Sequence, residues 1–357
     1  MKIKDIVAEL ESIAPLKYQE GYDNSGYIVG TPDAVFKKAL ICLDSTEAVL
    51  DEAIEKGCNL VIAHHPIIFG GLKKITGKNY VERVIMKAIK NDITIYAAHT
   101  NLDSVHNGVS RKICDRLGLQ HCRVLAPQSG VLKKLSVLCP IPQADAVRTA
   151  LWEAGAGQTA DHRETSFNLL GISTFTNSNT TPAETQYGEL KIETIFEAAA
   201  EGKIMQTLNT FSRSLRLYYE ISPIENKYSN VGLGMIGCLP EPQDPSEFLT
   251  GLKTTMQTPC IRHTRLFRKK VQHVAVCGGA GFSLLPHAIA QRADVFVTAD
   301  VKYHQFFDAD KHLILADIGH YESEQFTIEL LKELLSEKIS NFAAVLTSVN
   351  TNPVNYL

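Results

Sequence analysis

The sequence lacks three features that would each define a class of protein. No apolar run approaches the roughly 18 residues that a membrane-spanning helix needs, and the N-terminal segment has no apolar core of the kind found in signal peptides. None of the eight cysteines forms a CxxC pair, and several lie in apolar stretches, as expected for free thiols in a reducing compartment. We therefore expect a cytoplasmic protein without a membrane anchor.

An excess of basic residues is also absent. The 36 Lys and Arg residues are outnumbered by 39 Asp and Glu, and the formal net charge of −3 argues against a general nucleic-acid binder. One basic cluster precedes an apolar strand and consists of Arg262, Arg265, Arg268, Lys269 and Lys270. A solvated turn is the favoured interpretation of this cluster, and an anion-binding lip beside a substrate entrance is the alternative.

Alternating strands and helices occupy both ends of the chain. At 357 residues the protein is long enough for more than one domain. Residues 1–126 and 232–357 read as strand–helix repeats, which predicts right-handed crossovers and largely parallel sheets. The strand ends of the two segments resemble one another, so we predict two related α/β halves that form one metal-binding domain.

The middle of the chain, residues 127–231, follows a different pattern. Strands and helices are expected in the order βαββαβ, which is the ferredoxin-like arrangement. The polar segment 177–186 is expected to be an exposed loop between two of these strands, with a signalling loop as the alternative. Because candidate ligands lie on both sides of this region, we predict that it is an insertion into the α/β domain.

Three predicted strands of the α/β segments end in clusters of histidine and carboxylate. The candidate metal ligands in these clusters are His64, His65, Asp103, His320 and Glu324. Open α/β sheets place ligands beyond the carboxyl ends of their strands, so the clusters are expected to share one site. The strand carrying His64 and His65 is broken by a proline, which lets the two imidazoles serve neighbouring ions. His320 and Glu324 are four residues apart and share one helical face.

Imidazole and carboxylate ligands define the range of metals. We predict two divalent ions per subunit, with zinc favoured and iron, manganese, cobalt or nickel as alternatives. Five ligands leave coordination positions open for water, as in catalytic centres. His99, four residues before Asp103, is either a sixth ligand or a residue that holds a ligand in place. His99 and His304 are the candidates for moving protons during catalysis.

Six short motifs distributed along the chain carry a family resemblance. They are Asp23-Asn-Ser-Gly26, Leu43-Asp-Ser-Thr46, His64-His-Pro66, Thr100-Asn-Leu-Asp103, Thr298-Ala-Asp300 with Tyr303-His304, and His320-Tyr-Glu-Ser-Glu324. With these motifs the chain resembles the NGG-interacting-factor-three-like dinuclear metal hexamers, catalogued as type 2 GTP cyclohydrolase I homologues. The insertion resembles the PII/CutA-like domain of the longer members.

The resemblance implies a ligand set, an assembly and nearby residues. It implies that the five candidate ligands above hold two metals, and that the subunits form a toroidal homohexamer with the sites facing an internal cavity. It places Asp23 and Asn24 near the metals. In the second-half motif, Ala299 stands where the family usually has glycine. At the start of the first motif, Tyr22 stands where tryptophan is frequent.

Two functions are compatible with this resemblance. The first is a dinuclear-metal hydrolase that acts on a nucleotide, with GTP as the candidate, through metal-activated water. The alternative is a non-catalytic, metal-dependent hexameric scaffold or regulator whose PII-like domain senses a ligand. Fold and site resemblance alone assign no substrate.

Overall fold

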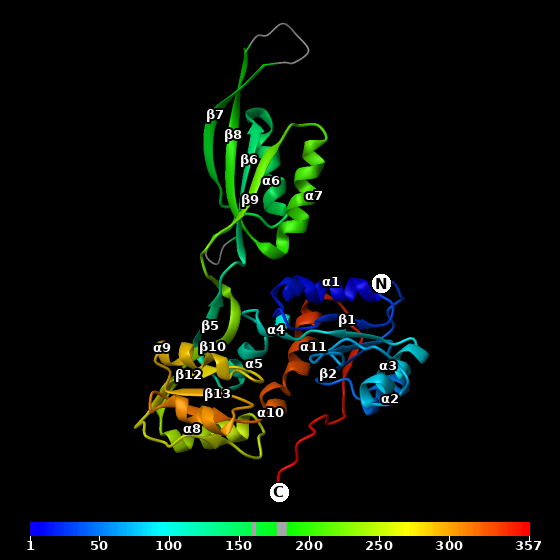
Figure 1. Ribbon diagram of the computed structural model, residues 1–357, viewed down its shortest axis with the longest axis vertical. Coiled ribbons are helices and arrows are strands. Elements are labelled where there is room, and N and C mark those ends of the chain that lie inside the picture. The colour runs from blue at the N-terminus through cyan, green and yellow to red at the C-terminus, as the bar shows by residue number, and fades with distance from the viewer. Residues whose placement is uncertain (159–161, 177–183) are drawn as a thin grey trace. The chain divides into compact units, whose positions relative to one another are not determined.

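The computed structural model describes residues 1–158, 162–176 and 184–357. These residues form two compact units, unit 1 with residues 1–127 and 230–357 and unit 2 with residues 128–229. The protein is a mixed α/β protein with three sheets (Figure 1). Within the described residues, every helix is too short or too polar to span a bilayer.

The first sheet of unit 1 has the strand order β1-β4-β3-β2-β15. Its strands are β1 (Gly26–Val29), β2 (Ala39–Cys42), β3 (Leu60–Ala63), β4 (Thr94–Ala97) and β15 (Ala344–Leu346). Strands β15, β2, β3 and β4 run parallel, whereas β1 pairs antiparallel with β4. Every residue of β2, β3 and β4 is buried, as expected for parallel strands that are covered on both faces.

Helices cover both faces of this first sheet. The helices are α1 (Ile3–Ile13), α2 (Glu47–Glu55), α3 (Tyr80–Lys90) and α11 (Thr327–Lys338). Ile41, Ile62 and Tyr96 share one hydrophobic cluster with α1 and α11. Their neighbours Leu40, Val61 and Ile95 share a second cluster with α2 and α3. Alternate residues of each strand therefore face opposite layers of helix.

The second sheet of unit 1 has the order β11-β14-β13-β12-β10-β5. Its strands are β5 (Gln120–Gln128), β10 (Tyr228–Gln243), β11 (Arg262–His263), β12 (Val271–Val276), β13 (Val295–Thr298) and β14 (Ile314–Asp317). Strands β12, β13 and β14 are parallel, and β10 and β11 pair antiparallel with them. The remaining helices of unit 1 are α4 (Thr100–Asp103), α5 (Val109–Arg116), α8 (Pro245–Thr255), α9 (Leu285–Ala290) and α10 (His320–Glu324), with the 3₁₀ segments η1 (Leu16–Tyr18), η4 (Phe282–Leu284) and η5 (Tyr303–Ala309).

Unit 2 is a four-stranded antiparallel sheet with two α-helices and a hydrophobic core of its own. Its elements in chain order are β6 (Leu132–Pro140), η2 (Ile141–Gln143), α6 (Ala144–Glu153), β7 (Phe167–Thr176), β8 (Glu184–Glu197), η3 (Ala198–Ala200), α7 (Glu201–Ser212) and β9 (Tyr218–Pro223). Most of the predicted polar loop 177–186 lies outside the described residues, and its last three residues begin β8.

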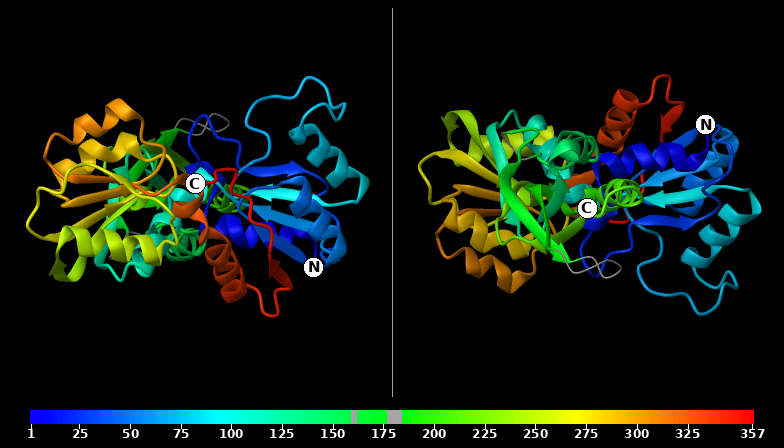
Figure 2. Two further views of the ribbon diagram at one scale, coloured as in Figure 1. Left: turned by 90° about the horizontal axis from the view of Figure 1, so that it is seen from below. Right: turned by 90° about the horizontal axis from the view of Figure 1, so that it is seen from above.

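The two sheets of unit 1 lie on opposite sides of that unit. Both views in Figure 2 show the blue and cyan strands of the first sheet apart from the yellow and orange strands of the second. The short helix α4 follows β4 in the first sheet, and α10 follows β14 in the second. Each sheet therefore supplies a strand end and a short helix to one site.

Candidate metal centre

The five sequence-predicted ligands come together, although they arise from three separate strand ends. His64 and His65 directly follow β3, Asp103 is the last residue of α4, and His320 and Glu324 begin and end α10. Three overlapping groups have ligand atoms within 4.8 Å of one another. These groups are His65, His320 and Glu324; His64, Asp103 and Glu324; and His64, His65 and His99.

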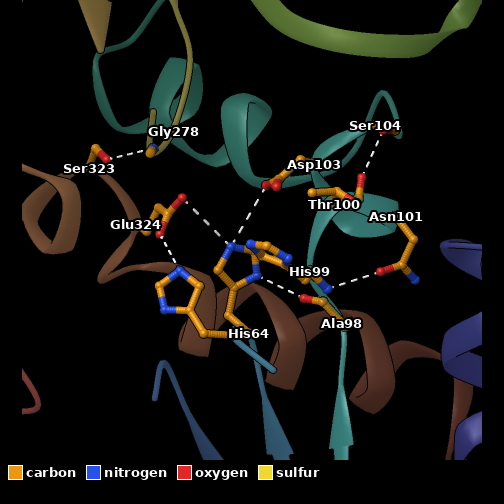
Figure 3. A network of polar contacts seen from close by, with 12 residues as sticks. His64, Ala98, His99, Thr100, Asn101, Asp103, Ser104, Gly278, Ser323 and Glu324 are labelled. Carbon is orange, nitrogen blue, oxygen red and sulfur yellow. Dashed lines mark hydrogen bonds and ion pairs between the residues drawn. The ribbon is translucent and has the colours of Figure 1, made fainter. Parts of the chain in front are cut away.

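Glu324 belongs to two of these groups. Its Oε2 lies 2.9 Å from His65 Nε2 and 3.1 Å from His320 Nε2. Its Oε1 lies 3.7 Å from His64 Nε2 (Figure 3). Glu324 is 3 % exposed. The distances show that its two carboxylate oxygens face two different sets of histidine nitrogens.

The contacts of His64 leave its Nε2 as the nitrogen that faces the candidate metal site. Its Nδ1 lies 2.8 Å from the carbonyl oxygen of Ala98, which only accepts, so Nδ1 carries the proton and donates (Figure 3). In the neutral ring, Nε2 then carries an unprotonated lone pair that a metal ion can accept. This buried nitrogen has no hydrogen-bond partner among the described residues, and neither has the buried Oδ1 of Asp103, 3.8 Å away. Two buried acceptors that face one another are unfavourable without a cation between or beside them. The residues present therefore fit a divalent ion.

The same burial affects the protonation of Asp103. Burial, reinforced by the nearby negative charge of Glu324, raises the pKa of Asp103 to about 6, although the surrounding histidines oppose this. A positive ion at this position would favour the charged carboxylate.

Carboxylates hold the other three histidines of the cluster. The Nδ1 atoms pair as His65 with Asp44 at 2.8 Å, His99 with Asp23 at 2.6 Å and His320 with Asp300 at 2.7 Å. Such partners fix the orientation of a metal-ligating ring and increase its basicity. The sequence motifs contained all three aspartates, but their pairing with particular histidines depends on the tertiary fold.

The pKa values of His65 and His320 follow from these contacts. Burial acts to lower the pKa of His65, but Asp44 and Glu324 outweigh burial and raise it to about 9. Burial likewise opposes a raised pKa for His320, yet Asp300 and Glu324 bring it to about 11. For Glu324, burial would raise the pKa, but hydrogen bonds from the surrounding histidines lower it well below its usual value. A divalent ion would replace the protons on these rings.

A glycine loop completes the wall beside Glu324. Gly279 has a left-handed φ of +61°, and a Cβ at this position would lie 2.4 Å from Glu324 Oε1 and 3.3 Å from His320 Cε1. Its backbone N–H donates to Ser323 Oγ at 2.9 Å. Gly278 and Gly279 both lie against the side chain of Glu324.

A cavity of about 800 Å³ is lined by most residues of the cluster, His64 excepted. Among the residues that line it are His65, His99, Asp103, His320 and Glu324, together with Tyr22, Phe69 and Arg262. Arg262 is the one Lys or Arg among the described lining residues, and it donates to the Asp317 carboxylate and to the Val301 carbonyl oxygen at 3.0 Å. One member of the basic cluster, Arg262, therefore reaches the cavity wall, while anion binding there stays a prediction.

His304 is the sequence-predicted residue that the structure does not bring to the cluster. It lies in η5, is exposed, and contacts the ring of Tyr303 at 5.1 Å between centroids. It is not among the described residues that line the cavity. His99, in contrast, lines the cavity, and its ring centroid is 5.3 Å from that of His64.

The fold and the site define a mixed α/β protein with a buried cluster of histidines and carboxylates that can hold metal ions. A model of the DUF34/NIF3 (NGG1p interacting factor 3) family matches residues 1–353, and the chain belongs to this family. It is 38 % identical over 347 residues to a GTP cyclohydrolase 1 type 2 homolog from Halalkalibacterium halodurans, an alignment covering 94 % of this chain and 93 % of that protein.

Further relatives match along the full length. A GTP cyclohydrolase 1 type 2 homolog from Bacillus subtilis is 33 % identical over 371 residues, which is 99 % of this chain and 98 % of that protein. The crystal structure of a Bacillus cereus protein related to NIF3 superposes with a TM-score of 0.88 at 34 % identity, covering 100 % of this chain and 99 % of that chain. A Staphylococcus aureus protein superposes with a TM-score of 0.78 at 28 % identity, with the same coverage.

Proposed function

We propose that this protein is a dinuclear-metal hydrolase that acts on a nucleotide. The observation that carries the proposal is the position of Glu324, which is shared by two ligand groups, with one oxygen toward His65 and His320 and the other toward His64. In this proposal His64 and Asp103 hold one ion, His65 and His320 hold the other, and Glu324 contacts both. Zinc is the favoured metal because imidazole and carboxylate are ligands that it commonly takes.

Two bound divalent ions would supply Lewis acidity and a water of lowered pKa. The proton transfers would be carried out by side chains of the protein. Asp23 accepts a hydrogen bond from Nδ1 of His99, so Nε2 of His99 is the nitrogen available to take or give a proton within the cavity. Opening the imidazole ring of a guanine base requires water at C8 and a proton for the departing nitrogen, and we assign that proton transfer to His99. His304 retains this role only if the assembled oligomer brings it to a cavity.

Three observations support a nucleotide as the substrate. Relatives that match over nearly their whole length are called GTP cyclohydrolase 1 type 2 homologs. The cavity volume of about 800 Å³ lies within the range that small-molecule sites occupy. Arg262, whose side chain is 56 % exposed, is the one Lys or Arg among the described residues of the cavity wall and offers a cationic group for phosphate.

We also propose a domain type for unit 2, a relation between the two α/β halves and an oligomeric state. Unit 2 is a PII/CutA-like module, supported by its βαββαβ order and separate core. The two α/β halves are related, supported by the run of neighbouring parallel strands in each sheet, four in the first and three in the second. The subunits form a toroidal homohexamer. The independent core of unit 2 also favours a second candidate function, a metal-dependent scaffold or regulator in which this module senses a ligand.

Elemental analysis of chelator-free protein tests the proposal first. We expect close to two divalent ions per chain, and loss of most of this metal in Glu324→Gln. The matched control is Glu337→Gln, which changes an exposed glutamate on α11. Chromatography of reaction mixtures then tests for GTP-dependent product, which should be abolished in Glu324→Gln and retained in Glu337→Gln.

The outcomes separate the two candidate functions. Two ions per chain without turnover of GTP or other nucleotides would favour the scaffold. Wild-type turnover by a Glu324→Gln protein would show that the proposed site is not where the chemistry takes place.

A further inference from the structure

Two large aromatic side chains line the metal cavity and are also strongly exposed. Tyr22 is 75 % exposed and Phe69 is 63 % exposed, and both belong to the cavity wall. Exposed aromatic side chains that gather at a cavity commonly mark a contact surface for a ligand or partner. The proposed metal chemistry does not use either of them.

The structure ties the segments that carry these two rings to one another and to the cluster. Asn24 Nδ2 donates to the Ile68 carbonyl oxygen at 2.7 Å, which joins the residues that follow Tyr22 to the residue that precedes Phe69. The Phe69 ring meets the His99 ring edge to face, with 5.9 Å between centroids and an interplanar angle of 82°.

The residue between Tyr22 and Asn24 makes the connection to the cluster tighter. The Asp23 carboxylate accepts hydrogen bonds from Nδ1 of His99, from Thr100 Oγ1 at 2.5 Å and from Ser25 Oγ at 2.7 Å. This network fixes the backbone next to Tyr22 relative to His99. Both aromatic side chains are thus anchored at their backbones, while their rings stay open to the cavity.

We infer that Tyr22 and Phe69 form a stacking surface for a planar nitrogen heterocycle, so that the ligand of this cavity is a nucleoside or nucleotide recognised through its base. The inference rests on the proposed function, because it names the part of the substrate that these residues bind. Every nucleobase has a π-face that an aromatic side chain can stack on, and removal of one such side chain weakens binding by about 5- to 100-fold. The position of Phe69 against His99 places the base beside the histidine that we assign to proton transfer.

Equilibrium dialysis of the full-length, metal-loaded protein with guanosine and with ribose 5-phosphate tests the inference. Guanosine has the base, whereas ribose 5-phosphate has the sugar and the phosphate without it. We expect Tyr22→Ala and Phe69→Ala each to weaken guanosine binding by about 5- to 100-fold and to leave ribose 5-phosphate binding unchanged. Tyr22→Phe and Phe69→Tyr keep a ring and should bind guanosine within about twofold of wild type, because either ring offers a stacking face.

The matched control is Phe307→Ala. Phe307 is 67 % exposed, close to the exposure of Phe69, but it lies in η5 and is not among the described residues of the cavity wall. This variant should bind guanosine as wild type does. Sedimentation velocity of each variant shows whether a substitution changes assembly instead of ligand binding.

Three results would overturn the inference. They are absence of guanosine binding to the wild type, wild-type guanosine affinity in both alanine variants, and a changed oligomeric state in those variants with unchanged affinity per chain, which would identify the rings as subunit contacts. The proposed hydrolase function fails on different evidence. A protein that binds guanosine through Phe69 but forms no GTP-dependent product would retain the inference and lose the hydrolase function.

Discussion

At the scale of single residues, the histidines of the cluster depend on carboxylates that do not touch the proposed ions. Asp300 has a left-handed φ of +56° and accepts from Nδ1 of His320. Its pKa is lowered by that hydrogen bond, so it is charged at neutral pH. Asp300 therefore holds the His320 ring in place and favours its binding to a cation.

Replacing this carboxylate should weaken metal binding without removing a ligand. We expect Asp300→Asn to lower metal affinity by about 10- to 100-fold, measured by competition with a chromophoric chelator. The control is Asp308→Asn, which changes an exposed aspartate on η5. Equal affinities in the two variants would mean that the Asp300–His320 contact does not orient a ligand.

The glycine loop gives a second prediction at this scale, because backbone strain and steric contact can be separated. Gly279→Ala and Gly57→Ala both place a side chain at a positive φ, +61° and +67° respectively, but a Cβ on Gly57 meets nothing within 4 Å. Each variant should lose about 1–2 kcal/mol of stability from the left-handed backbone alone. We expect only Gly279→Ala to lose bound metal as well, because its Cβ displaces Glu324. Elemental analysis and chemical denaturation of both variants measure these two effects, and full metal content in Gly279→Ala would contradict the proposed role of the loop.

At the scale of elements, the C-terminal segment is attached to α2 by one buried carboxylate. Burial acts to raise the pKa of Glu52, but hydrogen bonds from Lys56, Ser348 and Thr347 outweigh burial and lower it to about 2. The Ser348 backbone N–H donates to Glu52 Oε1 at 2.9 Å, and its hydroxyl does so at 2.6 Å. Glu52 therefore joins α2 to the residues that directly follow β15.

This attachment should depend on pH in a defined direction. A carboxylate whose pKa is depressed in the folded state contributes stability that is present above its usual pKa and is lost as the pH falls through the folded value. We expect Glu52→Gln to lower the free energy of unfolding by about 1.5–3 kcal/mol at pH 7, and the difference from wild type to shrink between about pH 4.5 and pH 2. Urea denaturation of the metal-free proteins measures this difference, with the exposed Glu55→Gln as control. A difference that stayed constant down to pH 2 would rule out the ionised carboxylate as its source.

The elements of the α/β core were predictable because their pattern is local. Residues 38–43, 59–63 and 93–98 are short apolar runs between turn residues, a pattern that predicts strands, and they contain β2, β3 and β4. The strand β15 was missed, because its pairing with β2 joins residues about 300 positions apart and no local signal specifies that contact. The sequence pattern from about 321 to 337 predicts one helix, whereas the structure has two, α10 ending at Glu324 and α11 beginning at Thr327.

The candidate site was predictable to a similar extent. The strand-end positions of the histidines and carboxylates suggested that they meet, and the structure places all five expected ligands in contact range of one another's groups. The partners that orient them, Asp23, Asp44 and Asp300, could be named from motifs but not matched to a histidine. The cavity that these residues share, and the contact of Gly279 with Glu324, follow only from tertiary packing.

At the scale of the whole molecule, the chain leaves and re-enters unit 1 between neighbouring strands. β5 and β10 are adjacent in the second sheet, and the Cβ position of Gly232 lies 2.8 Å from Pro127 Cα. All five expected ligands lie in unit 1. The two chain ends that residues 128–229 connect therefore lie close together, and a short linker can join them.

A protein in which a glycine–serine linker replaces residues 128–229 should fold and keep the full metal content. Both sheets, both layers of helix around the first sheet and the clusters of unit 1 remain in this variant. Circular dichroism and elemental analysis measure folding and metal content, and Glu324→Gln in the shortened chain confirms that any metal occupies the same site. A folded shortened chain that retains its ions but loses nucleotide turnover would assign unit 2 a regulatory role. A folded chain without metal would show that unit 2 is needed to form the centre, because the ligands are positioned by packing that the isolated α/β unit cannot maintain.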